Sequence, residues 1–161
     1  MRPPDAHGIL PTMDDRTVLV LNGPNLNLLG EREPEVYGRA TLADVEALCR
    51  AAAERAGLTV DFRQTNSEGT LIDWVQEGRA ATAGIVINAA GYTHTSVALR
   101  DALLAVHRPF WEVHLSDPWR RDEFRKVNFL HDIATATIAG HGALGYLEAL
   151  DQIAAQGGGP A

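Results

Sequence analysis

Short apolar segments alternate with helical patterns along this chain, and this alternation limits the possible folds more strongly than any other feature. The apolar segments, which we predict to be strands, are residues 17–23, 58–65, 84–89, 109–116 and 133–140. Helical patterns occupy residues 41–57, 69–83, 94–107 and 143–156, and a short charged turn covers 120–126. Parallel strands need a crossover connection, usually a helix. The alternation therefore predicts an α/β domain in which helices cover both faces of a parallel sheet.

Five strands connected in this way fit a flavodoxin-like three-layer sandwich, with a five-stranded parallel sheet of order 2-1-3-4-5. In such sheets, ligands bind beyond the carboxyl ends of the strands, near the point where the strand order reverses. Polar side chains stand at these ends, because Asn88 ends the third predicted strand and His114 and Ser116 end the fourth. We therefore predict a ligand site where these ends meet the loop that leaves the first strand.

The loop after the first predicted strand is unusually long. Residues 21–38, LNGPNLNLLGEREPEVYG, are rich in asparagine, glycine and proline, whereas two to six residues commonly connect a strand to a helix. Long loops of this kind are usually lids or binding loops. Tyr37, near the far end, is the first candidate for a reacting side chain.

The composition predicts one globular domain, because 161 residues with 45% hydrophobic content can bury a core. Residues 1–16 and 157–161 are rich in proline, glycine or charge without an apolar period, so we predict disordered tails around a single domain at 17–156. A formal net charge of −7 argues against nucleic acid and anionic membranes as partners. No segment has the apolar length of a membrane span or a signal peptide, so we expect a cytoplasmic protein.

The single cysteine, Cys49, cannot form an internal disulfide, which fits a reducing compartment. We predict that it packs inside the domain rather than reacting. It shares the predicted apolar face of its helix with Leu42, Val45, Leu48 and Ala52.

Two common motifs fit the sequence poorly. GHGALG, residues 140–145, matches the dinucleotide pattern G-x-G-x-x-G, but no strand follows and the chain ends before an acidic partner could occur. Close packing of a helix on a strand is the favoured reason for these glycines. Glu112 and His114 share a strand face, yet no H-E-x-x-H motif or cysteine cluster accompanies them, so we predict no metal site.

The remaining polar side chains suit acid–base chemistry and anion binding, although each taken singly also fits a structural role. They are Asn25, Arg32, Tyr37, Asn88, His94, His114, Ser116 and Arg125. The segments that carry them are NGPNLNLLGEREPEVYG, QTNSEGTL, NAAGYTHTSVALRDA, EVHLSDPWRRDEFR and the closing GYLEAL. Together, over nearly all of residues 17–155, they resemble the type II 3-dehydroquinate dehydratases.

This resemblance implies a flavodoxin-like enzyme of the shikimate pathway that converts 3-dehydroquinate to 3-dehydroshikimate without a cofactor or a metal. It also implies a homododecamer, a tetramer of trimers. By the same resemblance, the elimination is expected to be anti and to pass through an enolate. By resemblance, Tyr37 is the base and Arg32 is its partner in the loop. A tyrosine with a pKa of about 10 is only about 0.1% ionised at pH 7, and a nearby guanidinium favours the phenolate. Glu31, Glu33 and Glu35 would oppose ionisation, so we expect them to face solvent.

The resemblance makes His114 the general acid that protonates the departing hydroxyl, with Glu112 holding its ring. Asn25 matches the residue that stabilises the enolate oxygen, through an ordered water, and Asn88 matches a hydrogen-bonded neighbour. The other matched residues bind substrate: Leu115 and Ser116 the carboxylate, His94 and Arg125 the ring hydroxyls, and Asp101 the site of a neighbouring subunit.

Three features depart from the family pattern. Ala90 stands where glycine is usual, and its Cβ could narrow the approach to substrate. Asp117 replaces a common asparagine, and its charge could weaken anion binding. Residues 127–132, VNFLHD, lack the usual histidine–serine and serine positions, a change that the sequence does not explain.

Two alternatives stay open at this point. One is a flavodoxin-like module that binds a small acid or nucleotide without catalysis. The other is a dehydratase of a related hydroxylated ring acid. A biosynthetic and a catabolic role, in the use of quinate, involve the same reaction and are not separated by the sequence.

Overall fold

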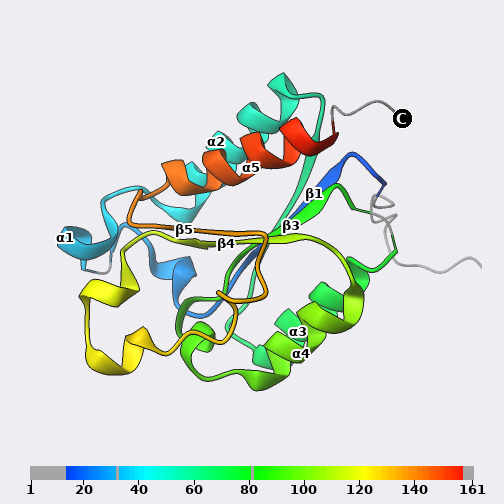
Figure 1. Cartoon of the computed structure of the whole chain (residues 1–161). Helices are drawn as coiled ribbons and strands as arrows, with labels where there is room; N and C mark the ends of the chain where they lie inside the picture. Colours follow the sequence, from blue (N-terminus) through cyan, green and yellow to red (C-terminus); the bar gives the residue numbers. More distant parts are fainter. Residues whose placement is uncertain (1–13, 32, 81, 158–161) are drawn as a thin grey trace, which may run out of the picture.

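The computed structural model describes residues 14–31, 33–80 and 82–157, which form one sheet between two layers of helices (Figure 1). The strands are β1 (Thr17–Asn22), β2 (Thr59–Gln64), β3 (Gly84–Asn88), β4 (Phe110–His114) and β5 (Ala136–Ala139). All pairings are parallel and the order is β2-β1-β3-β4-β5. The helices are α1 (Pro34–Tyr37), α2 (Leu42–Arg55), α3 (Glu68–Glu77), α4 (Val97–Val106) and α5 (Leu144–Gly157). The predicted flavodoxin-like α/β fold is confirmed.

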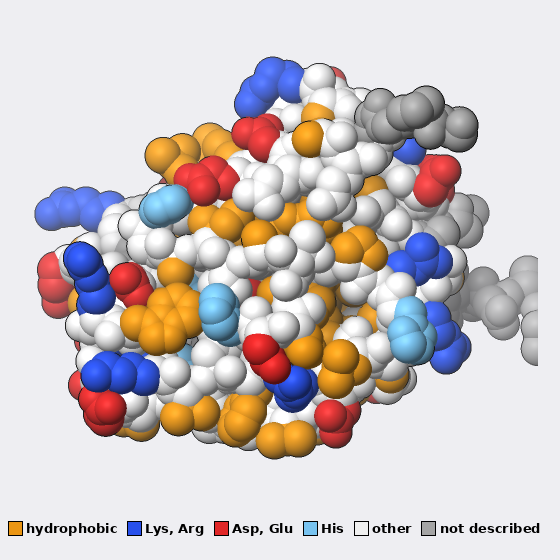
Figure 2. Space-filling model, viewed as in Figure 1, with side chains coloured by type: hydrophobic (Ala, Val, Ile, Leu, Met, Phe, Trp, Pro, Cys, Tyr) orange, Lys and Arg blue, Asp and Glu red, His pale blue; other side chains and the backbone are white. Residues whose placement is uncertain are grey.

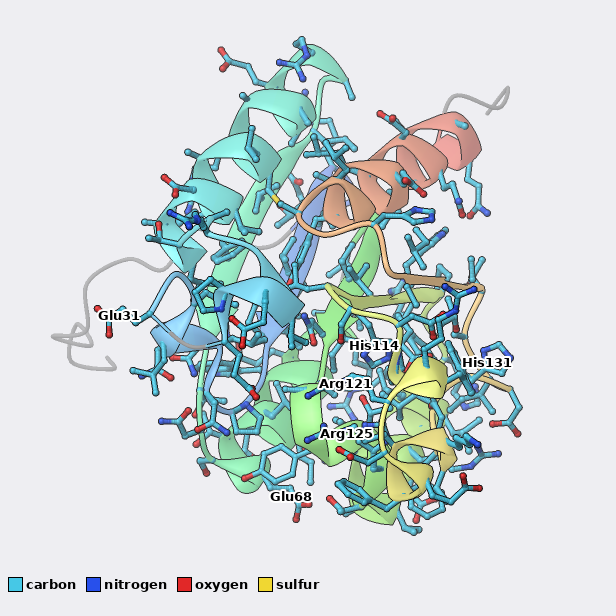
Figure 3. All side chains as sticks on the ribbon, turned by 90° about the vertical axis from the view of Figure 1, so that its left-hand side faces the viewer. Glu31, Glu68, His114, Arg121, Arg125 and His131 are labelled. Atoms are coloured by element: carbon cyan, nitrogen blue, oxygen red, sulfur yellow. The ribbon has the colours of Figure 1, made fainter. Side chains whose placement is uncertain are left out.

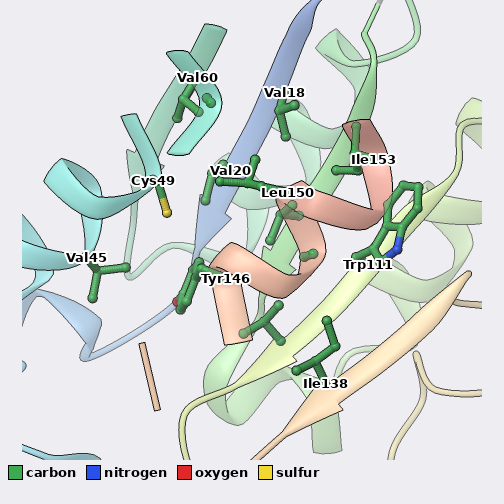
Figure 4. Packing of buried hydrophobic residues seen from close by; sticks show 14 of the residues in the cluster. Val18, Val20, Val45, Cys49, Val60, Trp111, Ile138, Tyr146, Leu150 and Ile153 are labelled. Atoms are coloured by element: carbon green, nitrogen blue, oxygen red, sulfur yellow. The ribbon is translucent and has the colours of Figure 1, made fainter. Parts of the chain in front are cut away.

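The two faces of the sheet build two separate cores. Because side chains alternate along a strand, Val18 and Val20 of β1 face one way and Leu19 and Leu21 the other. The valine face packs against α2 and α5, as the close-up in Figure 4 shows, and the leucine face packs against α3 and α4. The central strands β1, β3 and β4 are buried along their whole length, which explains their continuous apolar sequence.

Gly145 lets α5 approach the sheet closely. A Cβ at this position would lie 3.2 Å from Ile138 Cγ2 and 3.3 Å from Val113 Cγ1, so a larger side chain would push the helix outward. The packing explanation of the GHGALG motif is therefore confirmed for its last glycine.

Side-chain caps decide where three of the helices begin. Thr41 and Asp44 form a reciprocal capping box at α2, while Ser67 caps α3 and Ser96 caps α4. The predicted segment 94–107 was therefore too long at its start, because Ala90–His94 form a separate 3₁₀ turn, η2. The segment 69–83 was too long at its end, because Gly78 caps α3.

Two further expectations about the elements were wrong. The fifth strand begins at Ala136 rather than at residue 133, because the Ile133 and Ala134 N–H groups bond to the Leu130 carbonyl in a turn. Leu48 was expected on the buried face of α2, but 42% of it is exposed. The buried stripe runs through Val45, Cys49 and Ala53 at a spacing of four residues, and Leu48 lies to one side of it. Cys49 itself is buried, and burial raises the pKa of its thiol to about 12.

The edge of the sheet is tied to the residues just before β1. The Asp14 carboxylate accepts hydrogen bonds from the Arg16 N–H and the Thr17 hydroxyl, and the Arg16 carbonyl accepts from the Thr59 N–H. Residues 14–16, predicted to belong to a disordered tail, are thus hydrogen-bonded to the domain; residues 1–13 and 158–161 lie outside the described part.

The surface mixes charges of both signs. Figure 2 shows acidic and basic side chains interspersed on the face that it displays. Within the described residues, no helix is long and apolar enough to cross a bilayer.

Candidate active site

A pocket opens at the carboxyl ends of the central strands, where a flavodoxin-like sheet places its ligands. Three chain segments converge on it: the loop after β1, the η2 turn after β3, and the segment after β4. Its lining includes seven of the predicted site residues: Asn25, Asn88, His94, His114, Leu115, Ser116 and Arg125. Its other lining residues are Pro24, Leu26, Leu29, Ala90, Gly91, Pro118 and Arg121.

His114, the last residue of β4, is held by a carboxylate beneath the pocket. Its Nε2 lies 2.6 Å from Oε1 of Glu112, which is fully buried two residues earlier on the same strand. An ionised carboxylate can only accept hydrogen bonds, so the proton of this contact belongs to Nε2. Nδ1 is therefore the ring nitrogen left for exchanging a proton in the pocket.

Glu112 is ionised in spite of its burial. Burial by itself would raise the pKa of this carboxyl, but hydrogen bonds from His114, Asn128 and Thr137 outweigh it and hold the pKa below the ordinary value. The Asn128 Nδ2 and Thr137 Oγ1 atoms lie 2.7 and 2.8 Å from its oxygens. Glu112 is therefore a fixed negative charge that accepts the Nε2 proton of His114.

His94 presents a hydrogen-bond acceptor to the pocket. Its Nδ1 lies 2.6 Å from the Val127 carbonyl, which cannot donate, so Nδ1 carries the proton. Desolvation by burial lowers the pKa of His94. The ring is therefore neutral near pH 7, and its Nε2 can accept from a hydroxyl group of a ligand.

Two arginines make the pocket electropositive within a protein of net negative charge. Arg121 and Arg125 extend from the segment after β4 toward the same space beside His114 (Figure 3). Arg125 is oriented by Asp122, 3.1 Å from its Nε, and its guanidinium lies over the Phe124 ring at 5.1 Å. Among the described residues that line the pocket, none carries a carboxylate. This charge distribution suits an anionic ligand.

The start of the first loop is fixed by the loop after β2. Asn25 adopts a left-handed conformation with φ 68°, which asparagine tolerates better than most residues. Its N–H donates to Asn66 Oδ1 at 3.0 Å, and the same oxygen accepts from Gln64 Nε2. Asn25 is therefore held at the rim of the pocket by its backbone, which leaves its side chain for a ligand.

Asn88 is oriented by a buried tyrosine. Its Nδ2 donates to the Tyr146 hydroxyl at 3.0 Å, and that hydroxyl donates to Asn22 Oδ1 at 2.7 Å. Asn22 in turn donates to the Arg63 carbonyl. Tyr146 is fully buried, and burial raises the pKa of its hydroxyl, so it stays a neutral donor. The chain of bonds joins the ends of β1 and β3 to the start of α5.

Comparison with known proteins identifies the family of this chain. The family model described as Dehydroquinase class II matches residues 16–154, which is nearly the whole of the described chain. The chain belongs to the class II dehydroquinases.

Relatives within this family are similar over most of their length. A 3-dehydroquinate dehydratase 2 from Pseudomonas aeruginosa is 58% identical over 139 residues, which cover 86% of this chain and 94% of that protein. A 3-dehydroquinate dehydratase from Methylobacterium radiotolerans is 58% identical over 138 residues, covering 86% and 93%. The crystal structure of a type II dehydroquinase from Propionibacterium acnes superposes with a TM-score of 0.83 at 39% identity, covering 89% of this chain and 99% of that one.

Some predicted dehydroquinase residues lie outside the pocket or outside the described part of the chain. Asp101 is exposed on α4 and does not line the pocket of its own chain. Arg32 lies outside the described residues, and so does the side chain of Tyr37, whose backbone ends α1. Three carboxylates of the same loop are exposed, as expected: Glu31, Glu33 and Glu35.

Two departures from the dehydroquinase pattern have clear positions. Ala90 lines the pocket with φ 50°, a left-handed conformation that costs an L-residue roughly 1–2 kcal/mol and that glycine would adopt freely. Its N–H donates to Asn88 Oδ1 at 3.2 Å, a bond that helps to hold the turn. Asp117 does not line the pocket; its carboxylate accepts from the Trp119 N–H and lies 3.6 Å from Arg120 Nε.

Sequence reasoning missed several residues of the site. Arg121 was treated only as part of a charged turn, although two arginines four residues apart after a strand end are a usable signal. Asn128 and Thr137 reach Glu112 from distant positions, and Tyr146 joins Asn22 to Asn88 from the other end of the chain. No spacing in the sequence marks these contacts.

The side chains that could bind a metal ion do not cluster in the described part of the chain. Over the described ranges, no group of three or more histidine, cysteine, aspartate or glutamate side chains is arranged to hold an ion.

Proposed function

We propose that this protein dehydrates 3-dehydroquinate to 3-dehydroshikimate, as a cytoplasmic enzyme of the shikimate pathway. The observation that carries the proposal is the His114–Glu112 pair, 2.6 Å apart, beside a pocket lined by Arg121 and Arg125. This arrangement combines a proton donor with a site for a small anion. Several relatives carry the name 3-dehydroquinate dehydratase, which supports the same substrate.

The reaction is an anti elimination through an enolate. The Tyr37 phenolate, favoured by Arg32, removes the proton next to the ketone, and the electron pair moves to the ketone oxygen. Asn25 stabilises this oxygen through an ordered water. The enolate then expels the hydroxyl group, which takes the Nδ1 proton of His114 and leaves as water. Each proton is accounted for, because Tyr37 gains one and His114 loses one.

The other lining residues would bind the substrate. The backbone amides of Leu115 and Ser116, with the Ser116 hydroxyl, suit the carboxylate, because hydrogen bonds from neutral donors to an ionised acceptor are stronger than those between neutral groups. His94 suits a ring hydroxyl, because its neutral Nε2 is an acceptor. Arg125 and Asn88 supply donors to the remaining oxygens.

The first test is turnover of 3-dehydroquinate by the purified protein, followed by the ultraviolet absorbance of the conjugated enone. We expect turnover that a chelator leaves unchanged, because none of the proposed steps uses a metal or a cofactor. Absence of turnover with 3-dehydroquinate would contradict the proposal. Turnover of another hydroxylated ring acid would then indicate that the Ala90 methyl group has changed the choice of substrate, and binding alone would indicate a non-catalytic module.

We also propose that the protein assembles as a homododecamer, a tetramer of trimers, in which Asp101 reaches the pocket of a neighbouring subunit. Asp101 is exposed on α4, and Val97 and Leu104 of the same helix are also exposed. This apolar and acidic surface is what a neighbouring subunit would cover.

Sedimentation velocity should give about twelve times the 17.4 kDa mass of one chain. Asp101→Asn should reduce turnover and leave the sedimentation unchanged, because it removes a charge at the proposed site without removing apolar contacts. A fully active monomer would contradict both parts of this proposal.

A further inference from the structure

We infer that His131 and Thr137 are positioning residues for His114, and that they act through Glu112. The inference rests on the proposed role of His114 as the acid. His131 belongs to residues 127–132, the segment that departs from the family pattern, and so does Asn128, which contacts Glu112 directly. The inference therefore assigns a function to this segment. Figure 3 labels His114 and His131, at the two ends of this chain of contacts.

The orientation of Asn128 is unambiguous. Its Oδ1 accepts the backbone N–H groups of Leu130 and His131 at 2.8 and 2.9 Å. The amide nitrogen must therefore be the atom that lies 2.7 Å from Glu112 Oε1. Asn128 thus donates to the carboxylate, and the same oxygen receives the proton of His114 Nε2.

The direction of the Thr137 hydroxyl group also follows from its partners. Its Oγ1 lies 2.8 Å from Glu112 Oε2 and 3.0 Å from His131 Nδ1. A hydroxyl group has one proton, and the ionised carboxylate can only accept, so this proton points to Glu112. The Thr137 oxygen must then accept from His131, which requires a proton on His131 Nδ1.

His131 is exposed, but its position is well defined. Its backbone N–H is bound by Asn128, and its ring meets the Trp119 ring edge-on, with the centroids 5.3 Å apart and the planes at 70°. A hydroxyl group rotates freely unless its partners select one orientation. With its Nδ1 proton on the Thr137 oxygen, His131 offers that hydroxyl no outward acceptor, so this contact reinforces the direction toward Glu112 that the carboxylate sets.

The consequence for the pocket is a single arrangement of the His114 ring. Donors on both carboxylate oxygens prevent Glu112 from rotating away from His114. His114 therefore keeps its Nε2 proton on Glu112 and presents Nδ1 to the substrate. Loss of the Thr137 donor would free one carboxylate oxygen, and the ring would spend less time in the orientation that protonates the departing hydroxyl.

Kinetics of matched variants test the inference. We expect Thr137→Val, which keeps the shape and removes the hydroxyl, to lower kcat about tenfold with KM changed less than about twofold. His131→Leu should lower kcat about threefold by the same route. Thr137→Ser keeps the hydroxyl, and His131→Asn keeps an N–H donor near the position of Nδ1, so both should retain most of the wild-type kcat.

His141→Leu is the control for loss of an exposed histidine. His141 pairs with Glu148 at 2.7 Å and does not line the pocket, so this variant should have wild-type kinetics. If His131→Leu behaves like His141→Leu, the inference is wrong. His131 is exposed, so its variants are expected to fold even if Thr137→Val does not.

A second readout does not depend on catalysis. Solid-state ¹⁵N NMR of histidine-labelled protein near pH 8, where an ordinary imidazole is neutral, distinguishes protonated from bare ring nitrogens. We expect His131 to be protonated at Nδ1 in the wild type and to lose this preference in Thr137→Val. The His131→Asn spectrum assigns the signal. A bare Nδ1 on wild-type His131 would overturn the inference. If the wild type lacks dehydratase activity, the proposed function fails, and this spectrum alone then decides whether the chain of donors exists.

Discussion

Tyr37→Phe is expected to lower kcat for 3-dehydroquinate about a thousandfold while KM changes little. General bases contribute about 10²–10⁴ in rate, and phenylalanine keeps the ring while it removes the atom that takes the proton. The substrate contacts proposed for Ser116, His94 and Arg125 are unaffected, so binding should persist. Steady-state kinetics by enone absorbance, with binding of the substrate measured separately, checks both quantities.

The matched control for this variant is Glu35→Gln. Glu35 is exposed in the same short helix, α1, so its replacement changes the loop sequence without touching the proposed base. We expect near wild-type turnover. A Tyr37→Phe enzyme that keeps more than about a tenth of the wild-type kcat would show that another group is the base, because its contribution would lie below the usual range for general bases.

Glu112→Gln is expected to lower the free energy of unfolding at pH 7 by about 2–4 kcal/mol, since buried hydrogen bonds to a charged group are worth more than neutral ones. The glutamine has one acceptor oxygen where the carboxylate has two, so one of the three present donors meets an N–H group instead. Urea unfolding of both proteins measures the difference. Glu148→Gln, at an exposed pair with His141, should change the same free energy by less than about 0.5 kcal/mol.

The same pair of proteins should differ in their dependence on pH. The pKa of Glu112 is lower in the folded protein than its ordinary value of 4.5, so its stabilisation is fully present above that value. It is lost as the pH falls through the lower, folded-state pKa. The wild type should therefore lose its advantage over Glu112→Gln as the pH falls below about 4.5. A constant difference from pH 7 to pH 3 would contradict an ionised Glu112.

Local patterns in the sequence predicted the layout of the site because they report on one strand or loop at a time. His114 and Asn88 could be placed at strand ends from the apolar segments before them, and parallel connections bring such ends to one edge. The resemblance to the class II dehydroquinases indicated the same two side chains as site residues. The first and last residues of the helices were predicted less well, because several neighbouring residues could each serve as the cap, and only the structure shows that Ser96 caps α4.

The sequence by itself determined the α/β alternation, the edge of the sheet that holds the pocket and the identity of half of the fourteen lining residues. Only the tertiary structure decided which partners hold those residues. Glu112 is kept ionised, against the effect of burial, by hydrogen bonds from His114 on its own strand and from Asn128 and Thr137 in other segments. Asn88 is oriented by Tyr146 from the last helix. Leu48 lies on the surface because the stripe of α2 that is buried runs through Val45, Cys49 and Ala53 beside it. Periodicity along a chain follows from local geometry, whereas the direction of a buried hydrogen bond depends on which distant groups folding brings within about 3 Å.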